Sequence, residues 1–186
     1  MPQPSPRISG VEPEDFTDEQ RALVGEWSSM NFAKVIVRSP DLYRAFVPLI
    51  AKVIAGTNLP PRDRQVLCLR TLTLGDDVYE VTQHELISRS AGLTDAEIAA
   101  MRAGTGATLT PFDKTLIAAA EQLVRDQQIT DETWRALAER YSQAQLMEVV
   151  VLVGTYLTMA MVTKNYEIPL EDDETFNGFS KTRKYK

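Results

Sequence analysis

The sequence predicts an all-α protein, on three observations. Helix-capping sequences recur along the whole chain, and apolar residues repeat at the three- and four-residue spacing of helices. No stretch of five or more residues alternates between apolar and polar, as a half-buried strand would. At 186 residues the chain is long enough for one domain. We expect this domain over residues 17–170, between an N-terminal arm (1–16) and a C-terminal tail (171–186).

The helices of the first half of the chain are placed by the signals at their ends. Thr17 with Gln20 forms a capping box, Ser39-Pro40 supplies an N-cap and a first-turn proline, Pro60-Pro61 opens the next helix, and Gly92 ends the fourth. These signals predict helices over residues 17–30, 41–55, 61–75 and 77–91. The second helix carries an apolar stripe that we expect to face the core, formed by Leu42, Phe46, Leu49, Ile50 and Val53.

The second half continues in the same way and brings the expected total to seven to eight helices. Each helix begins at a hydroxyl residue suited to the N-cap, at Thr94, Thr110, Thr130 and Ser142. The predicted helices cover residues 94–102, 110–126, 130–141 and 142–166. From Val149 the last helix is apolar on nearly every side, which is typical of a bundle centre or of a contact between subunits.

Composition and charge exclude several classes of protein. A net charge of −6 argues against a nucleic-acid-binding surface, which would need a basic stripe. The first residues contain no apolar run of the signal-peptide kind. The longest apolar stretch, 149–162, is shorter than the roughly 20 residues that a membrane span needs. We therefore expect a cytoplasmic protein that binds neither nucleic acid nor membrane.

Cys68 is the only cysteine, so a disulfide or a cysteine-rich metal site cannot form within one chain. Its apolar neighbours favour a small buried hydrophobic residue, with a reactive thiol as the alternative. One histidine and scattered carboxylates do not supply three or four convergent ligands. We therefore expect neither a metal nor another cofactor.

The only histidine, His84, lies four residues after Glu80, so the two side chains share one face of the predicted helix 77–91. Ile87 and Ala91 continue that face, which places an imidazole and a carboxylate where core residues are expected. Burying both groups is costly unless they pair, and a pair of this kind can transfer protons. The alternatives are an ordinary pair on the surface or a structural histidine in the core.

Several segments resemble the signature of the carboxymuconolactone decarboxylase family, which also includes the alkylhydroperoxidase D enzymes. The similar segments are residues 59–66 (LPPRDRQV), 79–84 (YEVTQH), 91–98 (AGLTDAEI), 145–148 (QLME) and 153–156 (VGTY). The resemblance covers about residues 40–166. It implies an all-α helical bundle of the alkylhydroperoxidase D type that assembles as a homo-oligomer, with a trimer or hexamer favoured.

The chain departs from the family pattern at two places. The peroxidase branch carries a Cys-x-x-Cys pair at the positions of Asp77 and Glu80, so its disulfide cycle cannot run here. A glutamate often stands where this chain has Gln65, and an amide can form hydrogen bonds but cannot take a proton. The resemblance therefore points to the branch without paired cysteines.

The resemblance implies acid/base catalysis on a small organic acid or lactone, as in the catabolism of aromatic compounds. The catalytic residues would be His84 and Glu80, and the expected reaction is decarboxylation, with isomerisation or cyclisation as a related possibility. Residues on the same two helices would bind the substrate: Gln65 and Tyr79 by hydrogen bonds, and Arg64 or Arg70 by charge. Two other hypotheses are thiol-dependent peroxide reduction, disfavoured without the paired cysteines, and a non-enzymatic oligomeric protein that binds a ligand.

Overall fold

The computed structural model describes residues 6–172 and residue 175. Within them it contains nine α-helices, two short 3-10 helices and no strand. The all-α prediction is confirmed, and the number of helices is slightly higher than expected. The described residues form two compact units: one comprises residues 52–161, and the other comprises residues 6–51 together with the described residues from Val162. Most of the expected tail, 171–186, lies outside the described residues.

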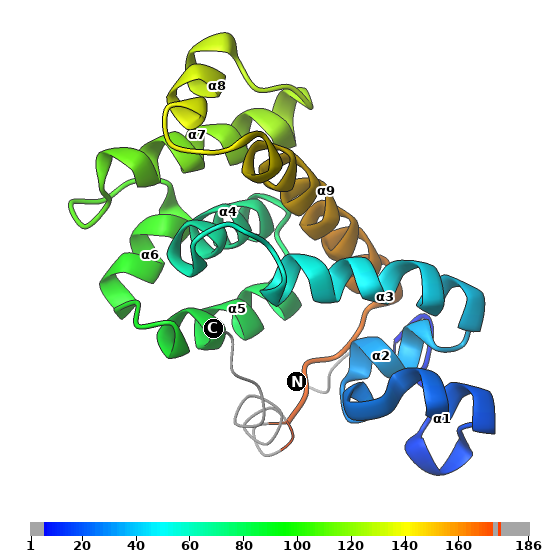
Figure 1. Cartoon of the computed structure of the whole chain (residues 1–186). Coiled ribbons are helices and arrows are strands. Elements are labelled where there is room, and N and C mark those ends of the chain that lie inside the picture. The colour runs from blue at the N-terminus through cyan, green and yellow to red at the C-terminus, as the bar shows by residue number, and fades with distance from the viewer. Residues whose placement is uncertain (1–5, 173–174, 176–186) are drawn as a thin grey trace. The chain divides into compact units, whose positions relative to one another are not determined.

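The observed helices begin and end close to the predicted positions (Figure 1). In chain order the elements are η1 (Pro13–Asp15), α1 (Asp18–Val24), η2 (Gly25–Trp27), α2 (Asn31–Ile36), α3 (Pro40–Ala55), α4 (Pro61–Leu74), α5 (Val78–Ser90), α6 (Asp95–Ala103), α7 (Pro111–Asp126), α8 (Asp131–Ala138) and α9 (Gln143–Tyr166).

The first unit differs from the prediction at its start. The capping box of Thr17 and Gln20 is present, but the helix it opens ends at Val24 because Gly25 adopts a φ of 50°. The short helix α2 follows and was not predicted. The described part of the N-terminal arm is hydrogen-bonded within this unit, since the Val11 amide donates to the carbonyl oxygen of Lys34 over 3.0 Å.

α3 buries only part of the predicted stripe, since Ile50 and Val53 face the interior as expected. Leu42 and Leu49 are 45% and 39% exposed, so their expected inward orientation is wrong. The buried residues follow helical spacings of three and four and include a polar one: Tyr43, Val47, Ile50, Val53 and Ile54. Tyr43 was missed because the predicted stripe included only purely apolar residues, and tyrosine carries a polar hydroxyl.

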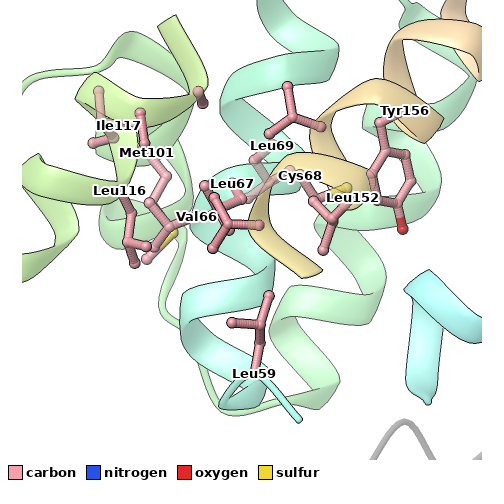
Figure 2. Close-up of a cluster of buried hydrophobic side chains, with 14 of the residues drawn as sticks. Leu59, Val66, Leu67, Cys68, Leu69, Met101, Leu116, Ile117, Leu152 and Tyr156 are labelled. Carbon is pink, nitrogen blue, oxygen red and sulfur yellow. The ribbon is translucent and has the colours of Figure 1, made fainter. Parts of the chain in front are cut away.

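α4 is the central helix of the second unit. It packs against α5, α6 and α7 (Figure 1), and apolar residues on several of its sides are fully buried. Figure 2 shows this core, to which α4 contributes Val66, Leu67, Cys68 and Leu69. Because it is enclosed on so many sides, the polar residues near its N-terminus are buried as well.

α9 is the longest helix and the most apolar. By length and composition it could cross a membrane, but half of its most apolar window is buried within the protein, as is common for a core helix. Leu152 and Tyr156 belong to the core of the second unit. Met147 and Met161, by contrast, are 68% and 62% exposed. The helix therefore has one face in the core and an apolar face that remains exposed.

Candidate functional site

Three polar residues occupy one buried face of α5. Glu80, His84 and Ser88 follow one another at intervals of four residues and are at most 4% exposed. The helix begins after Asp77, whose side chain accepts a hydrogen bond from the Glu80 amide over 3.3 Å. This N-cap fixes the start of α5 and with it the position of Glu80 in the first turn. The predicted Glu80–His84 pair therefore exists, and it is buried rather than on the surface.

α4 supplies a hydrogen-bond partner for the imidazole. Nδ1 of His84 lies 3.1 Å from Oε1 of Gln65, which is 1% exposed. With the amide oxygen of Gln65 towards the ring, a neutral imidazole carries its proton on Nδ1, because a carbonyl oxygen only accepts. The Ser88 hydroxyl lies 3.1 Å from the same oxygen and 2.7 Å from the carbonyl oxygen of His84. Gln65 therefore connects the two helices at the histidine.

The second ring nitrogen of His84 is buried but unsatisfied. Nε2 has no hydrogen-bond partner, and its distance to Oε2 of Glu80 is 3.9 Å. The ring also meets the ring of Tyr156 from α9 edge to face, with centroids 4.8 Å apart and planes at 89°. Packing and the Gln65 contact thus hold the imidazole in place, and they leave Nε2 as the atom that could take or give a proton.

Arg64 is a buried cation without a carboxylate. Its side chain makes no hydrogen bond or ion pair with any residue in the described part of the chain, although Arg64 is only 2% exposed. Burial lowers the pKa of this guanidinium, while nearby Tyr156 and Cys68 act in the opposite direction. A buried charge is costly when it is not paired. Orphaned buried polar groups of this kind call for a specific explanation, and a bound anion would provide one.

The imidazole is neutral at physiological pH. Burial, and secondly the positive charge of Arg64, lower the pKa of His84 from its ordinary value of 6.5 to about 3. The guanidinium and the ring are therefore close enough to influence one another. A neutral histidine can accept a proton at once, but it must first gain one before it can act as an acid.

Cys68 and Tyr156 complete the surroundings of the histidine. Figure 2 shows the sulfur of Cys68 on the side of α4 that faces Tyr156. Cys68 is 0% exposed, so the prediction of a buried cysteine is confirmed. Burial raises the pKa of the Cys68 thiol and also that of the Tyr156 hydroxyl, so both groups are neutral at pH 7. The hydroxyl of Tyr156 has no oxygen or nitrogen partner among the described residues, and the thiol of Cys68 is the polar group beside it.

Two of the predicted substrate-binding residues have other surroundings. Arg70 pairs with Glu121, its Nε donating over 2.8 Å, and it also donates to the carbonyl oxygen of Arg102. Tyr79 is buried in the first turn of α5, but a residue five positions before His84 points to a different face of the helix. The structure thus brings Glu80, His84, Gln65 and Arg64 together.

Sequence reasoning missed Ser88 and Tyr156 as members of this cluster. The signal for Ser88 was present, because it continues the four-residue spacing of Glu80 and His84. Tyr156 lies far along the chain, and only the fold places it against the imidazole. Among the described residues, no group of three or more histidine, cysteine or acidic side chains is arranged to hold a metal ion.

Residues 40–122 match the sequence model of the Carboxymuconolactone decarboxylase family. No curated protein matches the chain. Cys68 as the only cysteine excludes a Cys-x-x-Cys pair, so the resemblance to the branch lacking that pair is confirmed.

Solved structures share the fold over nearly the whole chain. The alkylhydroperoxidase AhpD core of an uncharacterized peroxidase-related protein from Ralstonia eutropha JMP134 is 16% identical, with a TM-score of 0.79 over 93% of this chain and 95% of that one. An uncharacterized peroxidase-related protein from Silicibacter sp. TM1040 is 14% identical, with a TM-score of 0.76 over 96% and 99%. The debrominase Bmp8 is 13% identical, with a TM-score of 0.73 over 94% and 96%. At these identities the likeness establishes an AhpD-like fold.

Proposed function

We propose that this protein, with its carboxymuconolactone decarboxylase family sequence and AhpD-like fold, is a cofactor-independent acid/base enzyme acting on a small organic acid or lactone. The observation that carries the proposal is the state of His84: its imidazole is buried and neutral, and Nε2 has no hydrogen-bond partner. A polar atom that is held in place and left unpaired is available for a substrate.

The proposed reaction is a decarboxylation followed by protonation of carbon. The bond between the carboxylate carbon and the substrate breaks, carbon dioxide leaves, and the bonding electrons remain on the substrate as a dienolate. Nε2 of His84, which is unprotonated in the neutral ring, takes a proton from solvent once the substrate is bound and then delivers it to the dienolate, which returns the ring to its neutral form. Glu80 orients the ring and favours its charged form, while Gln65 holds Nδ1. The positive charge of Arg64 stabilises the negative charge as it moves from the carboxylate to the dienolate oxygen.

The structurally similar proteins include a debrominase and two peroxidase-related proteins, and we propose neither of these activities for this chain. Thiol-dependent peroxide reduction needs an accessible, ionisable thiol, and Cys68 is fully buried with a raised pKa. Asp77 and Glu80 offer carboxylates where a disulfide cycle would need sulfur. The acid/base reaction uses groups that the site contains.

The proposal is tested by mixing the protein with γ-carboxymuconolactone and following the release of carbon dioxide. We expect release by the wild type and at least a hundredfold slower release by His84→Gln, in line with the roughly 10²–10⁴-fold contribution of general acid–base catalysis. Arg89→Met is the matched control, because Arg89 lies on the same helix but is exposed and paired with Glu85 and Asp95.

Equal rates for the wild type and His84→Gln would contradict the proposed role of the histidine. If neither protein releases carbon dioxide, γ-carboxymuconolactone is excluded as a substrate. In that case the organic molecule that copurifies with the protein would be identified by mass spectrometry. A molecule released unchanged after incubation would favour the hypothesis of a non-enzymatic binding protein, and a converted one would favour isomerisation or cyclisation.

We further propose that the protein forms a homo-oligomer, a trimer or a hexamer, through the exposed face of α9. The apolar residues of this face are 40–68% exposed and follow helical spacing: Met147, Val150, Val151 and Met161. A Cβ added at Gly154 on this helix would meet nothing within 4 Å, so a second helix could approach closely. Sedimentation velocity should show an assembly that dissociates in Met147→Glu but persists in Trp134→Glu, a control on α8. A monomeric wild type would contradict this proposal.

A further inference from the structure

The three arginines of α4 differ in a way that singles out one of them. Arg62 contacts Glu97 and Asp113, and Arg70 contacts Glu121, so each has an acidic partner. Arg64, which lies between them in sequence and is the most buried of the three, has no such partner among the described residues. A buried guanidinium without a carboxylate partner binds an anion more strongly than an exposed one, because the local dielectric is lower and less water competes for it.

Among the described residues, the titratable groups around His84 come from α4, α5 and α9, and Asp77 at the start of α5 acts on Cys68 in the same cluster. From α4, Arg64 and Cys68 face the site, and from α5, Glu80 does so. From α9 comes Tyr156, whose ring touches the imidazole. Burial keeps the thiol and the phenol neutral. Burial is the first cause of the lowered pKa of His84, and the positive charge of Arg64 is the second, which a bound anion could balance.

We propose that Arg64 binds an anionic group of the substrate and that this anion and a proton on Nε2 of His84 are taken up together. The inference rests on the proposed function and deepens it, because it states how a histidine that is neutral in the resting protein becomes a proton donor. An anion bound at Arg64 cancels the charge that opposes a second positive charge nearby. The proton comes from solvent, and no other co-reactant is needed.

The order of events then follows. In the resting protein the ring is neutral, since burial and Arg64 both disfavour the imidazolium. Binding of a carboxylate supplies the missing negative charge, and Nε2 takes a proton beside Glu80, 3.9 Å away. A neutral molecule of the same shape would not charge the ring. The site would thereby discriminate between an acid and its amide or ester at the protonation step as well as at the binding step.

The chain offers a direct measurement because His84 is its only histidine. Tag-free protein labelled with ¹³C and ¹⁵N in histidine gives one imidazole signal, whose shifts report the protonation state and the tautomer. The probe is trifluoroacetate, which stays ionised throughout an acid titration, and the matched neutral probe is trifluoroacetamide. We expect trifluoroacetate to raise the titration midpoint of His84 by about three pH units, from about 3 towards its ordinary value. Trifluoroacetamide should leave the midpoint unchanged.

Two variants locate the effect. In Arg64→Met the midpoint should be higher than in the wild type without any probe, and trifluoroacetate should no longer move it. Arg89→Met should behave as the wild type. An unchanged midpoint in wild-type protein at every trifluoroacetate concentration would overturn the inference, as would a response that persists in Arg64→Met. If Arg64→Met does not fold, the two probes on the wild type still decide the matter.

The outcome is separable from that of the proposed function, because the titration requires no turnover. If the midpoint responds to trifluoroacetate but no carbon dioxide is released, anion binding and protonation of His84 are coupled and the proposed decarboxylation is contradicted. Release that depends on His84 without any response of the midpoint would support the reaction and overturn the coupling.

Discussion

Arg62 and Arg64 lie two residues apart on α4, and only Arg62 is paired with carboxylates. The Arg62 guanidinium donates to both carboxylate oxygens of Asp113, over 3.3 and 2.9 Å, and to Glu97. Hydrogen bonds at the helix cap, from the backbone and hydroxyl of Thr94, combine with Arg62 to lower the pKa of Glu97 to about 2. Arg62 thus joins α4 to α6 and α7, whereas the charge of Arg64 is not paired with any described residue.

Substitution of these two arginines by methionine should change stability in opposite directions. Arg64→Met removes an unpaired buried charge and should raise the free energy of unfolding by about 1–3 kcal/mol. Arg62→Met leaves the buried Asp113 without its cation and should lower it by about 2–4 kcal/mol. Urea denaturation measures both. A loss of stability in Arg64→Met as large as that in Arg62→Met would mean that Arg64 has a structural role.

A second matched pair is formed by two tyrosines. Tyr141 donates a hydrogen bond to the buried carboxylate of Asp63 over 2.7 Å, so Tyr141→Phe should cost about 1–3 kcal/mol. The buried hydroxyl of Tyr156 has only the weak acceptor sulfur of Cys68 beside it, so Tyr156→Phe should leave the stability unchanged or raise it by up to about 1 kcal/mol. Thermal or urea unfolding of both variants checks this. Equal losses would show that the Tyr156 hydroxyl is satisfied in the native protein.

The stability of the protein should depend on pH through His84. Its pKa is about 3 in the folded state against an ordinary 6.5, so the unfolded chain binds a proton between these values that the folded chain does not. The free energy of unfolding should therefore fall as the pH is lowered from 6.5 towards 3, by up to about 1.4 kcal/mol per pH unit. Above pH 6.5 both states are neutral and this contribution is constant.

The control for this pH dependence is His84→Gln, which has no group that titrates in that range. Urea denaturation at several pH values should give a steeper decline for the wild type than for the variant. Parallel curves would show that His84 titrates similarly in both states. The comparison uses slopes, so a change in overall stability of the variant does not affect it.

The thiol of Cys68 should be unreactive in the native protein. It is 0% exposed, and burial raises its pKa, so almost no thiolate is present at pH 8. Reaction with Ellman's reagent should proceed no faster than unfolding and should become rapid in urea. Peroxide should be consumed equally by the wild type and by Cys68→Ser. Rapid labelling of the native protein, or slower peroxide consumption by the variant, would revive the reactive-thiol hypothesis.

Local signals predicted much of this fold. The capping boxes at Thr17 and Thr94 formed as expected, because a cap depends on residues within one turn. The Glu80–His84 pair could be predicted for the same reason. The predicted helix from 17 to 30 failed at Gly25, where a positive φ ends the helix inside an otherwise regular pattern.

The surroundings of the site could not be predicted in the same way. Whether Arg64 or Arg70 carries an unpaired charge depends on Glu121, which lies 51 residues after Arg70 and meets it only through the packing of α4 against α7. Gln65 entered the prediction through the family resemblance, and its contact with His84 spans two helices. Tyr156 reaches the imidazole from α9. The spacing of residues within one helix does not indicate which residues of a distant helix will contact it.

The imidazole of His84 is held at Nδ1 by Gln65 and flanked at right angles by the ring of Tyr156, so it cannot easily turn over. A fixed ring offers its remaining nitrogen from one direction only. A carbon atom protonated there would receive hydrogen on a single face, even if the intermediate itself is planar. A reaction run in heavy water should therefore incorporate deuterium in a single configuration. The chirality of the deuterated product would then report the orientation in which the protein holds the imidazole.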